Sequence, residues 1–254
     1  CQRLPPELCG AILQGVKLLL TSSVRMVFEG SSVGRGRWPR WLAAAADIRF
    51  TGYSREGSHT LLELSLPQLG EAAPELYEQT EFWPTRPRPE ATAVDVLADV
   101  VGDVAHRNPD SVRYDHALLG RLARWGQVLS EHLEAISLVG SAPALVSFNR
   151  QVAANAKELI DRTPPPQQVR VVGKLDMIRH STRSFALELE DGSEVYGVLE
   201  DHQQVELLRE WFGSRVLVLG RAVYRPSGSL LRIDAQRVES GAGQPRLFSK
   251  VPPP

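Results

Sequence analysis

The last third of the chain alternates short apolar runs with turn residues in an order that few folds can accommodate. The runs read as strand, strand, strand, helix, strand and strand. Asp191-Gly192 lies between the second and third runs and Pro226-Ser227-Gly228 between the last two, and both are typical turn sequences. The runs are residues 169–178, 184–190, 193–199, 203–212, 215–224 and 230–238. Because each strand-like run alternates apolar and polar residues, one face of each is expected to be buried, which predicts a small closed sheet.

This order of elements resembles that of OB-fold-like β-barrels. The resemblance covers the last third of the chain, and no family is identified for the whole. It implies a ligand surface across the second and third strands, with the loop after the first strand and the last hairpin as its two lips. The lips would carry Arg179, Arg183, Tyr224 and Arg225, whose cationic and aromatic groups suit phosphate and stacked bases.

The second strand carries charges that oppose nucleic-acid binding on this surface. If Phe185, Leu187 and Leu189 point into the barrel, then Glu188 and Glu190 point outward. Carboxylates on that face repel phosphate, and the formal net charge of -1 shows no general basic excess. We therefore expect the barrel to pack against its neighbouring domain or a protein partner, with nucleic acid as the alternative.

The chain of 254 residues, 43% of them hydrophobic, is long enough for two modest cores. We predict an α+β protein with a mixed α/β domain over residues 1–163, an OB-like barrel with one helix over 167–240 and a proline-rich tail over 241–254. A proline-rich connector at 83–90 divides the first domain into a β-rich start and a helical second half.

Periodicity and capping residues predict the elements of the first domain. Thr92 and Asp95 form a capping-box-like start to one helix, and Asp115 is placed to cap the next. The predicted helices are residues 8–20, 41–47, 92–106, 115–133 and 149–160, and the predicted strands are 24–29, 47–53, 59–66 and 136–139.

A second candidate site is the loop at residues 34–41, which holds three arginines and two tryptophans. These residue types suit phosphate contact and base stacking, and they are also enriched at the energetic centres of protein–protein interfaces. The alternative is that the tryptophans fold back onto the core as a lid. The candidate residues are Arg35, Arg37, Trp38, Arg40 and Trp41.

The sequence contains no motif for catalysis, metal binding or a cofactor. The six histidines lack metal-ligand spacing to cysteine or to one another, and no nucleophile elbow or P-loop ending occurs. Cys1 would be an amino-terminal nucleophile only if it is the true first residue. An enzyme would therefore have to build its site in the first domain from residues that are distant in the sequence.

Cysteine usage and hydropathy indicate the compartment. Cys1 and Cys9 form no disulfide framework, and the longest apolar stretch, 11–20, is interrupted by Gln14 and Lys17 and is too short to span a bilayer. We expect a soluble, cytoplasmic protein with reduced thiols and no membrane partner. Its richness in Ala, Arg, Pro and Leu is typical of bacterial chains from GC-rich genomes.

The tail contains Gln244-Pro245-Arg246-Leu247-Phe248, which resembles the Gln-x-x-Leu-Phe peptides with which some DNA-repair and replication proteins dock onto the bacterial sliding clamp. The resemblance covers five residues, and Pro245 stands where such peptides usually carry Leu. It implies partner docking through Gln244, Leu247 and Phe248. Alternatively, Leu247 and Phe248 pin the tail onto the protein's own surface.

Together these features predict a non-enzymatic accessory protein that contacts a macromolecule through the arginine- and tryptophan-bearing loop and the barrel lips. A protein is the expected partner and nucleic acid the runner-up, while an enzyme with a site in the first domain is the opposing class. A deep pocket with converging polar groups would favour an enzyme, and a flat patch with arginine and tryptophan would favour a binding module.

Overall fold

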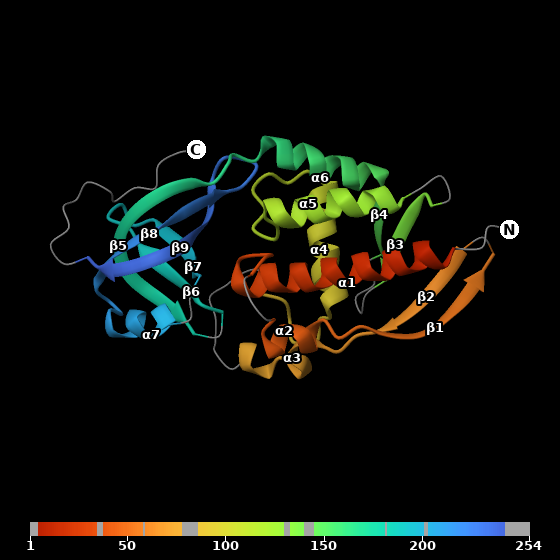
Figure 1. Ribbon diagram of the computed structural model, residues 1–254, viewed down its shortest axis with the longest axis horizontal. Helices are drawn as coiled ribbons and strands as arrows, with labels where there is room; N and C mark the ends of the chain where they lie inside the picture. Colours follow the sequence, from red (N-terminus) through yellow and green to blue (C-terminus); the bar gives the residue numbers. More distant parts are fainter. Residues whose placement is uncertain are drawn as a thin grey trace.

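The computed structural model places an N-terminal helical part and a C-terminal barrel side by side along the long axis of the molecule (Figure 1). It describes residues 5–34, 38–57, 59–77, 86–129, 133–139, 145–180, 182–200 and 203–241. The N-terminal part combines helices with two small antiparallel sheets. The predicted α+β fold class, with a mixed N-terminal part and a five-stranded C-terminal barrel, is therefore confirmed.

The N-terminal part is built from helices packed around α4, with two β-hairpins beside them. Its hairpins are β1 (Arg49–Glu56) with β2 (His59–Ser65) and β3 (Ala135–Val139) with β4 (Leu145–Asn149). Its helices are α1 (Pro6–Glu29), α2 (Arg40–Ala45), α3 (Leu69–Ala72), α4 (Ala93–Ala105), α5 (His116–Trp125) and α6 (Arg150–Arg162), with 3-10 turns η1 (Pro74–Leu76) and η2 (Gly126–Val128).

Helix α1 is longer than the sequence pattern predicts, and the strand predicted at 24–29 is wrong. Leu20, Val24 and Phe28 follow one another at four-residue spacing and are all buried, so core packing overrides the β-branched and aromatic composition. The helix ends where Gly30 takes a left-handed φ of 71° and donates its N–H to the Met26 carbonyl oxygen. One window of α1 is long and apolar enough to cross a bilayer, yet 61% of it is buried inside the protein, as in a core helix.

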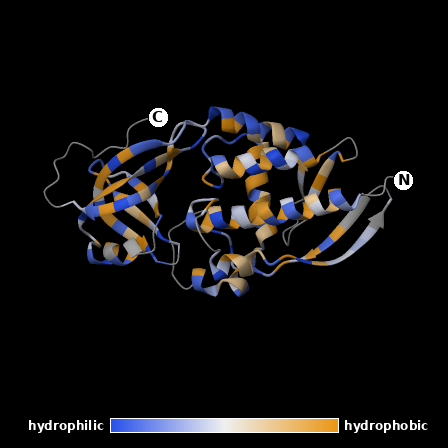
Figure 2. Cartoon of the chain, in the orientation of Figure 1, coloured by the Kyte–Doolittle hydropathy of each residue, from blue (hydrophilic) through white to orange (hydrophobic). Residues whose placement is uncertain are grey.

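Helices α4 and α5 begin at their predicted caps. The Asp95 carboxylate accepts a hydrogen bond from the Thr92 N–H at 2.7 Å, as part of a capping box. The Asp115 carboxylate accepts one from the Leu118 N–H at 3.0 Å. Hydropathy colouring shows α4 as strongly hydrophobic (Figure 2), which agrees with its contacts to α1 on one side and α6 on another.

The chain leaves α5 earlier than predicted, at Trp125 and not at residue 133. It passes into η2, where Gly126 allows a close approach to α6: a Cβ on this glycine would collide with Ala153. Helix α6 matches its prediction and is capped by Asn149, whose side chain accepts from the Val152 N–H at 3.0 Å. Strand β4 is missed by the sequence pattern because its short run leads directly into that cap.

The barrel closes in the strand order β5-β6-β7-β9-β8, with β7 and β9 parallel and every other pair antiparallel. This order, with α7 between the third and fourth strands, is compatible with an OB-like barrel. Phe185 and Leu187 are fully buried and Glu188 is exposed, so the predicted facing of β6 is confirmed. The elements are β5 (Gln167–Arg179), β6 (Ser184–Glu188), β7 (Glu194–Leu199), α7 (Gln203–Glu210), β8 (Arg215–Tyr224) and β9 (Leu230–Ser240).

Candidate functional site

The first barrel lip, which was predicted to bind a ligand, lies against the N-terminal part of the same chain. Arg179 is buried and donates from Nη2 to the Leu76 carbonyl oxygen at 3.1 Å. Arg183 takes a left-handed backbone conformation, with φ of 57°, and its Nη2 lies 3.6 Å from Oε2 of Glu29 in α1. Both predicted cations therefore contact their own chain.

The second lip, the last hairpin, is docked in the same way. The Ser227 N–H donates to the Pro109 carbonyl oxygen at 3.2 Å, and Ser229 Oγ donates to Oδ1 of Asp110 at 3.3 Å. Tyr224 is buried in the barrel core, so its ring offers no stacking surface to an external base. Packing of the barrel on its neighbouring domain or on a protein partner was the expected arrangement, and contact with the neighbouring N-terminal part is what the structure shows.

A buried ionic network also joins the two parts. Asp115 accepts hydrogen bonds from the Ser32 N–H at 3.0 Å and from the Ser32 hydroxyl at 2.5 Å. Arg232 of β9 is also buried, and it places Nη2 3.2 Å from Asp115 and Nε 2.7 Å from Asp234. Burial alone would raise the pKa of Asp115, but Arg232 and the hydrogen bonds from Ser32 and Leu118 lower this pKa by more, so the carboxylate is held ionised.

A second group of buried charges extends the network around Glu29. Nε of Arg25 lies 2.6 Å from Oε2 of Glu29, one helical turn away. Gly34 makes room for this arginine, because a Cβ there would collide with its guanidinium group. Arg121 of α5 donates to the Ser32 carbonyl oxygen at 3.1 Å, and burial lowers its pKa. Since removing one partner of a buried pair leaves an uncompensated charge, we interpret this network as the structural connection that holds the barrel on the N-terminal part.

The acidic residues of α4 are paired as well. Asp103 lies 3.1 Å and Asp99 3.7 Å from the guanidinium group of Arg113. Within the described ranges, no three or more His, Cys, Asp or Glu side chains are arranged to hold a metal ion.

The two tryptophans of the arginine- and tryptophan-bearing loop differ in burial. Trp38 is 44% exposed, and Arg40, at the start of α2, is exposed as well. Trp41 is instead buried and meets the Phe28 ring edge to face, with 5.9 Å between centroids. Trp41 is thus anchored in the core, as the alternative interpretation proposed, and Trp38 is the accessible ring. Arg35 and Arg37 lie outside the described residues.

The β1–β2 hairpin forms a ribbon at the opposite end of the molecule from the barrel (Figure 1), and it carries an apolar face that sequence analysis missed. Phe50 pairs with Leu64 and Tyr53 pairs with Leu62, so these four side chains share one face. Phe50 is 55% exposed and Tyr53 is 74% exposed. The face therefore presents two aromatic rings to solvent.

A β-bulge brings these two rings to the same face. In a regular strand Phe50 and Tyr53, three residues apart, would point to opposite faces. The register shifts between Phe50 and Gly52, which leaves Thr51 as the extra residue. The Thr51 hydroxyl donates to the Glu63 carbonyl oxygen at 3.1 Å across the ribbon. Counting alternation along the sequence cannot find this face, because the bulge changes the period.

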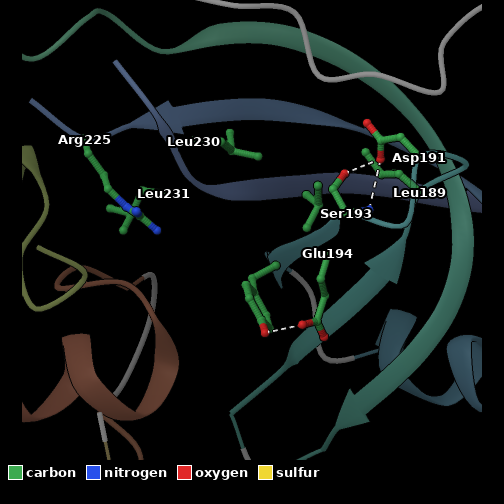
Figure 3. A pocket seen from close by; sticks show the side chains of 9 residues that line it. Leu189, Asp191, Ser193, Glu194, Arg225, Leu230 and Leu231 are labelled. Atoms are coloured by element: carbon green, nitrogen blue, oxygen red, sulfur yellow. Dashed lines mark hydrogen bonds between the residues drawn. The ribbon is translucent and has the colours of Figure 1, made fainter. Parts of the chain in front are cut away.

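A pocket of about 360 Å³ opens on the barrel between the starts of β7 and β9 (Figure 3). Leu230 and Leu231 line one side, and Asp191 and Glu194 line the other. Arg225 also lines this pocket, and it is the one predicted lip residue that does so.

No protein-family model matches this chain, and no curated protein or solved structure is significantly similar to it. The likeness to OB-like barrels therefore rests on strand order and helix position. The tail residues Gln244, Leu247 and Phe248 lie outside the described residues, so docking through the tail stays a prediction.

Proposed function

We propose that this chain is a binding protein that recognises a protein partner through the apolar face of the β1–β2 ribbon. The observation that carries the proposal is the exposure of Phe50 and Tyr53 on one face of the ribbon, beside the half-buried Leu62 and Leu64, of which Leu64 packs on the N-terminal core. Removing apolar surface from water contributes about 25 cal/mol of favourable free energy for each Å² that is buried. Aromatic side chains grouped on a surface are typical centres of protein–protein interfaces. A partner that covers this face would recover that free energy.

The exposed part of the predicted arginine and tryptophan loop supports the same class of function. Trp38 and Arg40 are accessible at the start of α2, and both residue types are enriched at interface hot spots. We assign them a secondary role, because Trp41, the other ring of the loop, is committed to the core.

Nucleic-acid binding by the barrel has weaker support. Arg179 and Arg183 of the first lip already bind groups of the N-terminal part. Glu188 and Glu190 are exposed on and just after β6, where they would repel a phosphate backbone. Co-purification of nucleic acid is therefore the outcome that would oppose the proposal.

The test is affinity purification of the tagged chain from its native cell, with and without nuclease treatment. We expect a stoichiometric protein partner that survives nuclease, and at least a tenfold loss of it with the double variant Phe50→Ser, Tyr53→Ser, because hot-spot truncations commonly cost about 2 kcal/mol or more. The matched control is Phe212→Ser, which removes a ring that is 61% exposed on the barrel side and should retain the partner.

Two outcomes would contradict the proposal. Equal retention of the partner by the double variant and by the control would place the interface elsewhere. Nucleic acid that co-purifies, with all proteins lost on digestion, would support the nucleic-acid alternative. The melting temperature of the double variant should stay close to that of the wild type, because both rings are exposed in the free protein.

A further inference from the structure

The barrel pocket is a wedge between two parallel strands that separate. β7 and β9 pair from Gly197 and Ile233 onward and diverge before these residues. The space between the diverging ends is the pocket of about 360 Å³ (Figure 3), within the range of about 300–1,000 Å³ that is common for ligand sites. On the β7 side, the turn that forms the rim is closed by a hydrogen bond from the Leu189 N–H to the Ser193 carbonyl oxygen at 2.8 Å. On the β9 side, the last hairpin is hydrogen-bonded to Pro109 and Asp110 of the N-terminal part. Contacts within the protein therefore hold both walls of the pocket in place.

A β-bulge supplies the apolar wall of the wedge. Val223 pairs with Arg232 and Tyr224 pairs with Leu230, so Leu231 is an extra residue on β9. Leu230 and Leu231 both line the pocket, although they pack on different cores: Leu230 is half-buried against the barrel cluster, and Leu231 is buried against the N-terminal cluster.

The polar groups of the wedge differ in charge from one end to the other. Asp191 and Glu194 stand on the exposed rim, and both carboxylates already accept hydrogen bonds from their own turn and strand. Oδ1 of Asp191 accepts from the Ser193 N–H at 3.0 Å and from the Ser193 hydroxyl at 2.5 Å (Figure 3), and Oε2 of Glu194 accepts from the Tyr196 hydroxyl at 2.5 Å. Arg225 stands on the opposite side of the pocket (Figure 3). Its buried Nε has no hydrogen-bond partner among the described residues. A buried donor of this kind is costly until an acceptor reaches it.

We propose that this wedge binds an extended peptide segment in which a lysine or arginine is flanked by apolar side chains. The basic side chain pairs with the rim carboxylates of Asp191 and Glu194, and the apolar side chains pack on Leu230 and Leu231. A peptide carbonyl oxygen accepts the hydrogen bond of Arg225 Nε. A nucleotide is disfavoured, because its phosphate would face the two rim carboxylates. This site is separate from the ribbon and goes beyond the function proposed above.

The probe is N-acetyl-leucyl-lysyl-leucinamide, titrated into the full chain at low salt and followed by calorimetry or NMR. We expect saturable binding that weakens as salt is raised, and weaker binding of the matched peptide with glutamate in place of lysine. Glu194→Gln and Asp191→Asn should each weaken binding roughly two- to fivefold, and the double variant roughly tenfold.

The matched control is Glu190→Gln. Glu190 is the neighbour of Asp191 in the sequence and is exposed, but it pairs with Arg215 at 2.9 Å and does not line the pocket. The affinity of this variant for the probe should stay within about twofold of the wild type, because the charge that it removes is exposed and lies outside the pocket. Arg225→Met, which keeps the aliphatic stem, should weaken binding of both peptides equally, because the carbonyl acceptor is common to them.

Three results would overturn the proposal: no binding of the lysine peptide, equal binding of the glutamate peptide, or tighter binding of adenosine monophosphate than of either. The ribbon variant Phe50→Ser, Tyr53→Ser should bind the probe normally. A loss of partner with the ribbon variant and a loss of peptide with the wedge variants are therefore independent results.

Discussion

Asp115 serves three contacts with one carboxylate. It caps α5 through the Leu118 N–H, holds the turn at Ser32 and pairs with Arg232 of the barrel. The first contact is local, and a capping pattern in the sequence predicts it. The contact with Ser32 spans 83 positions of the chain and exists only in the folded protein.

At the residue scale, Asp115→Asn separates the charge from the cap, because Asn caps helices as well as Asp does. The folded protein lowers the pKa of Asp115 below its ordinary value of 3.8, so the unfolded chain binds this proton more tightly. The stability from the ionised carboxylate is therefore complete above the ordinary value and is lost as pH falls through the lower pKa of the folded state. We expect Asp115→Asn to reduce the free energy of unfolding by roughly 3 kcal/mol at neutral pH. The variant should also lack the loss of stability that protonation of Asp115 causes in the wild type at acidic pH.

Urea unfolding at about pH 3 and about pH 7 measures both effects. The control is Asp99→Asn, an exposed carboxylate 3.7 Å from Arg113, which should change stability by no more than about 0.5 kcal/mol. An Asp115→Asn protein as stable as the wild type at neutral pH would show that the buried network does not hold the structure together.

At the scale of elements, the barrel depends on a glycine that faces an aromatic ring. Gly197 of β7 pairs directly with Phe185 of β6, and a Cβ on Gly197 would collide with that ring. Phe185 is fully buried, so the ring has no room to withdraw. Gly102 of α4 is the opposite case, since its Cβ position has no neighbouring atom within 4 Å.

The two glycines should therefore respond to alanine in opposite directions. Gly197→Ala overpacks the barrel core and should destabilise the protein by roughly 1–3 kcal/mol. Gly102→Ala removes a flexible residue from a helix interior and should stabilise it by about 0.5–1 kcal/mol. Denaturant midpoints at constant m-value give both differences. A Gly197→Ala protein as stable as the wild type would mean that β6 and β7 leave room for a methyl group beside Phe185.

At the scale of the whole molecule, the barrel has a hydrophobic core of its own. Its cluster is separate from that of the N-terminal part, which takes in only Val223 and Leu231 from the barrel among the described buried residues. Ion pairs and hydrogen bonds also cross the junction, through residues such as Arg232 and Arg179. The two parts are thus joined both by these two apolar side chains and by polar groups that are buried at the junction.

A fragment of residues 166–241 should consequently fold alone into a β-rich domain. It includes Gly241, whose N–H donates to the Arg215 carbonyl oxygen at 2.8 Å. We expect a cooperative thermal transition by circular dichroism, at a lower temperature than in the full chain because Val223 and Leu231 lose their cover. The absence of a cooperative transition would contradict an independent barrel and the predicted domain boundary.

Elements with nearby partners were predictable from local patterns. The turn at Asp191-Gly192 was anticipated from composition, and Gly192 indeed has a positive φ of 78°. The caps at Thr92 and Asp115 were found because their partners lie three residues away. The strand predicted at 24–29 failed, since its composition favours a strand while its burial in the core demands a helix. The apolar ribbon face was missed because a bulge altered the period.

The sequence by itself determined the α+β class, the order of the barrel elements and the capped helices, because alternation, turn residues and caps act over a few positions. The tertiary structure alone decided that Arg179 and Arg183 face the protein's own N-terminal part, and that Trp41 is core while Phe50 and Tyr53 are surface. These outcomes depend on which side chains, distant in the sequence, are buried together in the folded protein. Once water is excluded, an unpaired charge is costly, so the partners available in the interface determine where each side chain lies. No local pattern carries that information.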